Sequence, residues 1–363
     1  MVVKLSDVCE RESSNLKQSD IICGSGRYPV YGAAGHIGSV DFYHQEAPYI
    51  AVVKDGAGIG RTVMLPGKSS VIGTMQYLIP KDNVIPEYLC YVVQHMHLEK
   101  YFSGATIPHI YYKDYKNEEF NVATLEDQEC IVKILDMINE IKGLINEELD
   151  RLNELIKARF VEMFGDPIQN PNRWRVASIG DIATDIKYGT SKPSVECGKY
   201  PYLRMNNITY DGKIDINDLK FIDIAEDEIE KYIVRKGDIL FNRTNSIELV
   251  GKTALFDLIE DMVIAGYIIR VRIDNRLLPE VLSQYMNSNA LKDILRGMAK
   301  GAVNQANINA QELKSIKVYI PDMELQKKFV MIKGQVDKSK AKIQKSLDET
   351  QLLFDSLMQK YFG

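Results

Sequence analysis

The sequence predicts an α+β protein built twice on one plan, in which a globular domain of short strands and helices precedes one long helix. Three observations support this prediction. The two halves of the chain align with each other, each half ends in an apolar stripe at helical spacing, and the remainder consists of short apolar runs between Gly and Asn turns. The 363 residues, 45% hydrophobic and 26% charged, have ordinary globular composition and suffice for two domains.

An internal repeat gives the domain organisation. Residues 125–165 align without a gap with residues 323–363, and 11 of the 41 paired positions are identical. Shorter matches upstream keep the same order, such as residues 60–64 with residues 251–255. Because chance does not readily produce an ordered series of matches, the repeat predicts a duplicated unit. The predicted parts are globular domains at 1–123 and 167–320 and spacer helices at 124–166 and 321–363.

Each repeat is predicted to end in one long helix that packs against the other helix. Thr124 and Asp322 are N-cap residue types at equivalent positions, and Gly165 ahead of Pro167 is typical of a helix end. The first helix carries a net charge of −6 and the second one of +2, which suits two apolar seams paired in an antiparallel coiled coil. The alternative is two independent amphipathic helices, each packed on its own domain.

A helix of this length extends about 60 Å at 1.5 Å per residue, so the pair would hold the two globular domains apart. The side chains expected in the helix–helix contact are Ile134, Ile138, Ile145, Leu149, Leu152, Ile332, Val336, Ile343, Leu347 and Phe354.

The two globular domains are predicted to be mixed α+β. Strands are expected at 49–53, 200–204 and 237–241, where apolar β-formers lie between turn residues. A short helix is expected after each Pro-Glu pair, at residues 87–100 and 280–295.

Composition limits the compartment and the class of protein. The five cysteines are scattered and form no Cys-x-x-Cys pair, so we expect neither disulfides nor a zinc site, and a reducing cytoplasm. No apolar run approaches the roughly 20 residues that span a bilayer, so we expect no membrane association. The net charge of −5 alone argues mildly against a nucleic-acid binder.

Two segments of the chain look like catalytic or cofactor-binding motifs, but neither has the residues that such a motif requires. Residues 56–62 are glycine-rich, but Asp55 and Arg61 occupy the positions where a phosphate loop needs Gly and Lys, so a hairpin turn is favoured. All five histidines lie in the first domain, and His95 with His97 fits a solvated helix end better than a metal site. We therefore expect no catalytic residue, metal or cofactor in this chain.

Polar, planar and basic side chains gather on corresponding loops of the two domains. Arg pairs with guanine and Asn or Gln with adenine in the major groove, whereas Lys, Ser and Thr favour phosphates. The candidate DNA contacts are Lys54, Arg61, Thr106, His109, Tyr111 and Lys113 in the first domain, and Tyr188, Lys192, Arg204, Asn206, Asn207, Arg243, Asn245, Ser246, Lys300, Asn304, Gln305 and Asn307 in the second.

The order of these features resembles the specificity subunit of type I restriction-modification systems. Each long helix opens with a Leu-Glu-x-Gln or Met-Glu-x-Gln sequence and closes with Phe-Gly, and the second domain is similar to that family's target-recognition domains. The similar segments are Trp174 with Ile179-Gly180-Asp181-Ile182, Tyr200-Pro201-Tyr202-Leu203-Arg204, Lys236-Gly237-Asp238-Ile239-Leu240, and Asn307-Ile308 with Leu313. The first domain departs from the pattern, because it has no Trp at its start and has His109-Ile110-Tyr111 where the second has an Asn-Gln-Ala-Asn loop.

The resemblance implies a non-catalytic reader of double-stranded DNA. Each domain would bind one half of a split, asymmetric target, and the paired helices would fix the gap between the halves. Two methyltransferase subunits would use S-adenosylmethionine to modify adenine, and restriction subunits would use ATP and Mg to translocate and cut DNA.

Three other readings stay open at this point. They are a tandem-domain enzyme acting on a small molecule, a scaffold whose helices only tether partners, and the specificity part of a methylation-only or type II-like system. Most of the acidity lies in the first spacer helix, whereas the two domains have net charges of −2 and +1. The charge therefore indicates a reader that binds DNA poorly by itself.

Overall fold

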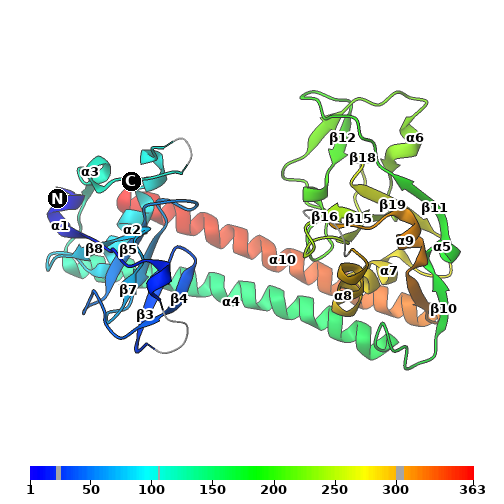
Figure 1. Cartoon of the computed structure of the whole chain (residues 1–363), viewed down its shortest axis with the longest axis horizontal. Helices are drawn as coiled ribbons and strands as arrows, with labels where there is room; N and C mark the ends of the chain where they lie inside the picture. Colours follow the sequence, from blue (N-terminus) through cyan, green and yellow to red (C-terminus); the bar gives the residue numbers. More distant parts are fainter. Residues whose placement is uncertain (22–25, 105–106, 300–305) are drawn as a thin grey trace. The chain divides into compact units, whose positions relative to one another are not determined.

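The computed structural model describes residues 1–21, 26–104, 107–299 and 306–363. The chain divides into two compact units. The first comprises Met1–Glu147 with Ile343–Gly363, and the second comprises Glu148–Lys342. The two long helices, α4 and α10, contribute to both units (Figure 1). Each unit is described by itself.

The first unit contains the following strands and helices, in chain order: β1 (Val2–Lys4), α1 (Leu5–Val8), β2 (Cys9–Ser13), η1 (Gln18–Asp20), β3 (Tyr28–Gly32), β4 (Gly35–Val40), β5 (Tyr49–Val53), β6 (Thr62–Leu65), β7 (Ser70–Val71), β8 (Met75–Pro80), α2 (Pro86–His95), η2 (Leu98–Tyr101), α3 (Tyr112–Tyr115), β9 (Glu119–Asn121) and the start of α4 (Leu125–Phe164).

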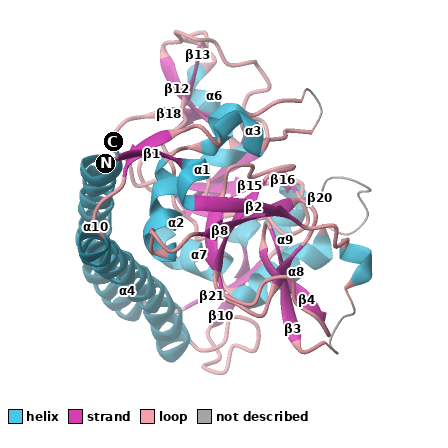
Figure 2. Cartoon of the chain, turned by 90° about the vertical axis from the view of Figure 1, so that its left-hand side faces the viewer, coloured by secondary structure: helices cyan, strands magenta, loops and turns pink. Residues whose placement is uncertain are grey.

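A four-stranded antiparallel sheet in the order β2-β8-β5-β6 forms the centre of this unit, and Figure 2 shows β2 and β8 side by side. Every residue of β5 is buried. Ile50 and Val52 point to one face, where α2 packs, while Tyr49, Ala51 and Val53 point to the other. This alternation is the period of two that a strand imposes. A smaller sheet, β4-β3-β7, includes the parallel pair β3·β7.

The second unit contains the following elements, in chain order: β10 (Arg175–Ser178), α5 (Ile179–Ile182), β11 (Ala183–Tyr188), β12 (Tyr200–Leu203), η3 (Met205–Asn207), β13 (Lys220–Ile222), α6 (Ile229–Tyr232), β14 (Ile233–Val234), β15 (Ile239–Asn242), β16 (Thr244–Asn245), β17 (Thr253–Leu255), β18 (Met262–Ile264), β19 (Ile268–Ile273), α7 (Pro279–Met286), α8 (Asn289–Met298), β20 (Ala306–Asn307), α9 (Ala310–Ser315), β21 (Lys317–Ile320) and the start of α10 (Met323–Phe362).

The two units share one topology, as the repeat predicts. The central sheet of the second unit runs β11-β19-β15-β17, which matches β2-β8-β5-β6 strand for strand, and all its pairs are antiparallel. A second sheet again contains one parallel pair, β12·β18, in the place of β3·β7. The mixed α/β character and the duplicated plan are therefore present in the structure.

The two long helices pack against each other in both units. In the first unit, Ile131 and Leu135 at the start of α4 share a buried cluster with Met358 and Phe362 at the end of α10. In the second unit, the end of α4 meets the start of α10, where the ring centroids of Phe160 and Phe329 are 5.5 Å apart. The beginning of one helix thus meets the end of the other, and the two run antiparallel.

The structure corrects one position of the expected helix–helix contact. Ile134 is 39% exposed, whereas its neighbour Leu135 is fully buried. Either residue would continue an apolar stripe at helical spacing. In the structure the stripe that faces the other helix contains Leu135 and then Lys142, whose ammonium lies 4.6 Å from the ring centroid of Phe354. The other expected contact residues, from Ile138 to Phe354, are buried or half-buried.

A buried glutamine at the start of each long helix explains the repeated Glu-x-Gln sequence. The Gln128 carboxamide accepts a hydrogen bond from the Ile85 N–H at 2.8 Å and donates to the Ala123 carbonyl at 3.0 Å. Gln326 accepts from the Leu278 N–H at 2.8 Å and donates to the carbonyls of Pro321 and Arg276. Each glutamine therefore ties its long helix to the turn that precedes α2 or α7.

Two short helices differ from the expected ranges. The helix expected at 87–100 ends at His95 and continues only as a separate 3₁₀ turn, because His97 adopts a left-handed φ of 50°. The helix expected at 280–295 is two helices, α7 and α8. The break falls at Ser288, which takes an extended conformation and caps α8 by accepting a hydrogen bond from the Leu291 N–H.

Candidate nucleic-acid interface

The first-unit candidates gather where β5 ends. Lys54 and Asp55 continue from β5, and the segment around His109 pairs with them through a bridge between Asp55 and His109. The Ile110 N–H donates to the Lys54 carbonyl at 2.9 Å, which fixes this pairing. The neighbouring β5–β6 hairpin brings Arg61 to the same strand end, where its guanidinium donates to the Ala33 carbonyl. The expected hairpin turn at residues 56–62 is confirmed, with Gly56, Gly58 and Gly60 at positive φ.

The first cluster comprises Lys54, Asp55, His109, Tyr111 and Lys113. Asp55 bridges Lys54 Nζ at 2.5 Å and His109 Nδ1 at 2.7 Å. Burial raises the pKa of Asp55, but the hydrogen bonds from Lys54 and His109 outweigh burial and leave that pKa below its ordinary value. The Tyr111 ring stacks on the His109 ring with centroids 6.4 Å apart, and Lys113 Nζ lies 5.3 Å from the Tyr111 centroid. Asp55 is not among the candidate DNA contacts predicted from the sequence, although it joins Lys54 to His109 in this cluster.

The second cluster comprises Tyr188, Arg243 and Asn307 and lies where β15 ends. The Arg243 guanidinium carbon is 4.9 Å from the centroid of the Tyr188 ring, and Nη2 donates to Asn307 Oδ1 at 3.1 Å. The Tyr188 hydroxyl is itself held, since it accepts a 2.8 Å hydrogen bond from the Ala310 N–H. Asn245 is on the adjoining β16, which pairs with β20.

Backbone hydrogen bonds make the two clusters equivalent. Val53 exchanges hydrogen bonds with Gly60 and Arg61 in the first unit, as Asn242 does with Gly251 and Lys252 in the second. Lys54 and Arg243 are the next residues along these strands. Their carbonyls accept from the N–H groups of Ile110 and Ile308, respectively. Lys54 therefore corresponds to Arg243, and His109 corresponds to Asn307.

The structure removes Asn207 from the candidate DNA contacts. Its side chain is 3% exposed, its oxygen accepts from the Arg204 N–H, and its amide donates to the carbonyls of Asp215 and Asp218. A side chain engaged in this way holds the loop after β12 together and cannot reach a base edge. The Arg204 guanidinium is also engaged, because Nη2 donates to the Asp218 carboxylate at 2.8 Å.

The remaining candidates do not join the second cluster through any contact in the described part of the chain. Lys192 donates to the Glu228 carboxylate at 2.6 Å. Asn206 and Ser246 are exposed. Thr106, Lys300, Asn304 and Gln305 lie outside the described residues.

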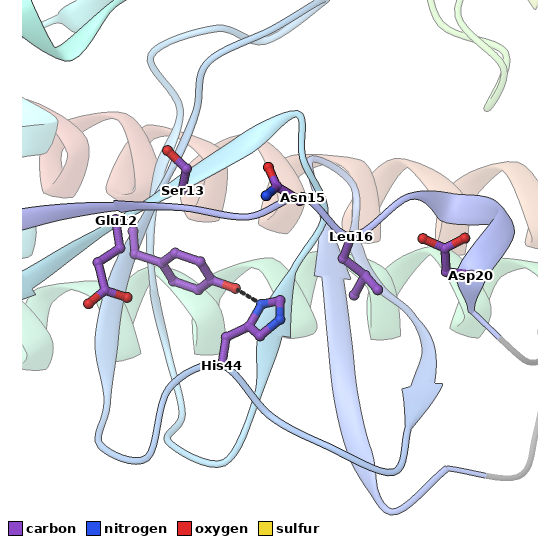
Figure 3. Close-up of a pocket in the computed structure, with 7 residues that line it drawn as sticks. Glu12, Ser13, Asn15, Leu16, Asp20 and His44 are labelled. Atoms are coloured by element: carbon purple, nitrogen blue, oxygen red, sulfur yellow. Dashed lines mark hydrogen bonds between the residues drawn. The ribbon is translucent and has the colours of Figure 1, made fainter.

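A polar cavity of about 410 Å³ in the first unit is a place where a small molecule could bind (Figure 3). Figure 3 shows Glu12 and His44 on its wall, and His44 Nδ1 is hydrogen bonded to the Tyr77 hydroxyl at 3.0 Å. The strand registers place Lys187 and Arg270 of the second unit at the positions of Glu12 and Tyr77. Glu12 and Tyr77 of the cavity are therefore not repeated in the second unit, whereas a tandem-domain enzyme would need its catalytic groups repeated in, or shared across, both halves.

Across residues 1–21, 26–104, 107–299 and 306–363, no group of three or more His, Cys, Asp or Glu side chains is arranged to hold a metal ion. Within the same ranges, no helix has the length and apolar character needed to cross a membrane.

Comparison with protein families gives a match over most of the chain. The model described as the type I restriction modification DNA specificity domain matches residues 1–154 and again residues 171–350. The chain is 33% identical over 196 residues to the MjaX specificity subunit of Methanocaldococcus jannaschii, a match that covers 53% of this chain and 46% of that protein. It is 22% identical over 280 residues to the type I restriction enzyme EcoKI specificity subunit of Escherichia coli, covering 72% of this chain and 60% of that protein. The matches thus span between about half and 60% of these relatives.

Solved structures share the fold over nearly the whole length. The S subunit of a type I restriction-modification system from M. genitalium superposes with a TM-score of 0.58 at 16% identity, covering 100% of this chain and 96% of that chain. A chain solved in a study of complex assembly and conformational transition of the type I R-M system gives a TM-score of 0.56 at 17% identity, covering 99% and 97%. At these identities the likeness concerns the fold alone.

Proposed function

The chain belongs to the type I restriction-modification DNA specificity family, and from this premise we propose that it is a non-catalytic subunit that reads a two-part DNA target. Each globular domain would read one half of the target, and the paired helices would set the gap between the halves. This proposal rests above all on the two clusters, which occupy equivalent positions in the two units but carry different chemistry.

The difference between the clusters supports an asymmetric target. A Lys–Asp–His set occupies the strand end in the first unit, and an Arg–Asn pair stacked on a tyrosine occupies it in the second. Base edges in the major groove are distinguished by the pattern of donors and acceptors presented to them. Two domains that share one backbone plan but carry different donors and acceptors would therefore select different sequences in the major groove of their half-sites.

The long helices are proposed to form an antiparallel coiled coil that acts as a spacer. Their half-buried positions alternate at spacings of three and four, as in Val336, Lys340, Ile343 and Leu347. Lys340 donates to Asn153 on the facing helix, and burial lowers the pKa of Lys340. Polar residues in such a seam fix the register of a coiled coil, and a fixed register gives the spacer a defined length.

The partners would be methyltransferase and restriction subunits. An apolar stripe made of Ile134, Met137, Ile141 and Leu144 runs along the outer face of α4 and is 39–61% exposed, which is typical of a surface that a partner covers. We assign it to a methyltransferase subunit, which would also bring S-adenosylmethionine. Met137→Glu is expected to reduce co-purification of that subunit, and Glu129→Gln, at an exposed position of the same helix that is not a neighbour of the stripe, should leave it unchanged.

Shortening the spacer tests the proposed function. Removing one heptad from each long helix shortens the pair by about 10 Å, which corresponds to about three base pairs at roughly 34 Å per turn of DNA. Long-read methylation mapping in a host that carries the shortened subunit with its methyltransferase should show the same two half-sites with a smaller gap. An unchanged gap would refute the spacer, and the absence of any sequence preference conferred by the full-length chain would refute the reader.

The methylation-only or type II-like system stays an alternative for the assembly. A host assay for cleavage of unmodified DNA separates it from a restriction system. The small-molecule enzyme is tested by turnover of the purified chain, and the scaffold by charge reversal at Arg243, which a scaffold would tolerate without change of sequence preference.

A further inference from the structure

We propose that Arg243 reads a guanine in the half-site of the second domain, with Tyr188 and Asn307 as the residues that position its guanidinium. This inference rests on the proposed function and adds the base and the residues that select it. Arginine is the side chain best matched to guanine, because two of its N–H groups can donate together to O6 and N7 in the major groove.

The free donors of Arg243 distinguish it from three other arginines of the same unit. Arg204, Arg235 and Arg272 donate to Asp218, Glu230 and Asp238, respectively. Arg243 has no carboxylate partner within the described ranges, and its only hydrogen bond to a side chain there is the one from Nη2 to Asn307. A guanidinium has five N–H donors, so the Nη1 end and the second hydrogen of Nη2 remain for a base.

The guanidinium is also held in one orientation. The Tyr188 ring lies against its face at 4.9 Å, and the Tyr188 hydroxyl is fixed by the Ala310 N–H. Asn307 fixes one edge, and the buried Nε shows that the base of the side chain is packed within the domain. Holding the fork in place before binding removes part of the ordering cost of binding, so the residue can discriminate strongly between bases.

The first unit does not repeat this arrangement. Lys54, at the position of Arg243, is neutralised by Asp55 at 2.5 Å and has no planar fork. Changes at Lys54 should therefore alter only the other half of the target. This gives an internal test of which half-site each domain reads.

Methylation mapping provides the first experiment. The full chain is expressed with its methyltransferase subunits, and the methylated target is mapped for the natural protein and for Arg243→Ala, Arg243→Lys and the control Arg235→Ala. Arg235 lies at the opposite end of β15 and is paired with Glu230 and Asp261. We expect one guanine of one half-site to be relaxed in the Arg243 variants, while the other half-site and the control stay unchanged.

Binding by the purified complex provides the second experiment and covers the case in which a variant methylates nothing. The probes are the mapped duplex and the same duplex with 7-deazaguanine in place of the guanine that the variants relax. If no variant methylates DNA, 7-deazaguanine is placed at each guanine of the two half-sites in turn. A good bidentate contact corresponds to roughly tenfold to hundredfold discrimination. Loss of N7 should weaken binding of the natural complex about tenfold at one guanine and should leave binding of the Arg243→Ala complex nearly unchanged there, because alanine has no donor for N7.

The outcomes separate the two proposals. Suppose that the natural protein confers a two-part target. The assignment of Arg243 is then wrong if Arg243→Ala keeps the same sequence preference as Arg235→Ala, or if the natural and Arg243→Ala complexes respond equally to 7-deazaguanine. In either case the proposed function stands. If the base that is relaxed belongs to the half-site that Lys54→Ala also relaxes, the assignment is again wrong. If the natural chain confers no sequence preference, the proposed function itself fails.

Discussion

Replacing Gln128 or Gln326 with alanine is expected to destabilise one unit in each case. Both side chains are fully buried. Gln128→Ala leaves the Ile85 N–H and the Ala123 carbonyl without their partner. At about 1–3 kcal/mol for each buried group left unpaired, the free energy of unfolding should fall by about 2–4 kcal/mol, allowing for partial access of water. Gln326→Ala removes the partner of three backbone groups, so its loss should be at least as large.

Urea unfolding of the full chain measures the loss, and hydrogen exchange assigns it to a unit. Because the two units can unfold separately, the curves are fitted with two transitions. Gln344→Ala is the matched control, since Gln344 lies exposed on α10 and its one side-chain hydrogen bond among the described residues goes to the exposed Asp348. It should change stability by less than about 0.5 kcal/mol. The reasoning fails if both buried variants fall within the range of the control, or if Gln128→Ala weakens the second unit instead.

Two further predictions concern buried charge in the second unit. Asp185→Ala removes the carboxylate 2.6 Å from the fully buried Arg270, so the free energy of unfolding should fall by about 3 kcal/mol. The control Asp293→Ala, which breaks the surface pair with Arg296, should cost no more than about 1 kcal/mol, and equal losses in urea unfolding would contradict the prediction. Burial lowers the pKa of Lys292 from 10.5 to about 8, so between pH 8 and 10.5 the unfolded chain binds more protons than the folded chain, and the stability rises with pH. Lys292→Met should flatten this rise between pH 8 and 10, and an identical slope in the natural protein and the variant would refute the prediction.

The long helices are the part of the fold that sequence reasoning predicts best. Forty residues without Pro, with an N-cap at Thr124 and Gly165 at the end, leave little alternative to a helix. The exact buried stripe is harder to predict. Ile134 and Leu135 are adjacent and both apolar, so two stripes satisfy the same spacing, and the route through Leu135 includes Lys142, which no apolar pattern contains. Tertiary packing on the first domain decides between them, because Leu135 joins the cluster around α2.

The candidate site could be predicted only as a list of residue types on loops. Asn207 and Arg243 look alike in sequence, as polar residues after a strand, yet one is sealed inside its loop and the other presents free donors. The difference depends on partners distant in sequence, since Asp215 and Asp218 engage the loop of Asn207, while Asn307 lies 64 residues from Arg243.

The correspondence between Lys54 and Arg243 shows what the repeat adds to such a list. The two positions differ in residue type, and the sequence offset between the units changes from 189 at these positions to 198 at His109 and Asn307, so alignment alone does not pair them. The backbone does, because the carbonyls of Lys54 and Arg243 accept from equivalent N–H groups. A duplicated scaffold that keeps its hydrogen bonds while exchanging the side chains at one strand end separates what maintains the fold from what selects the ligand, so the differences between the copies are the residues to mutate when specificity is tested.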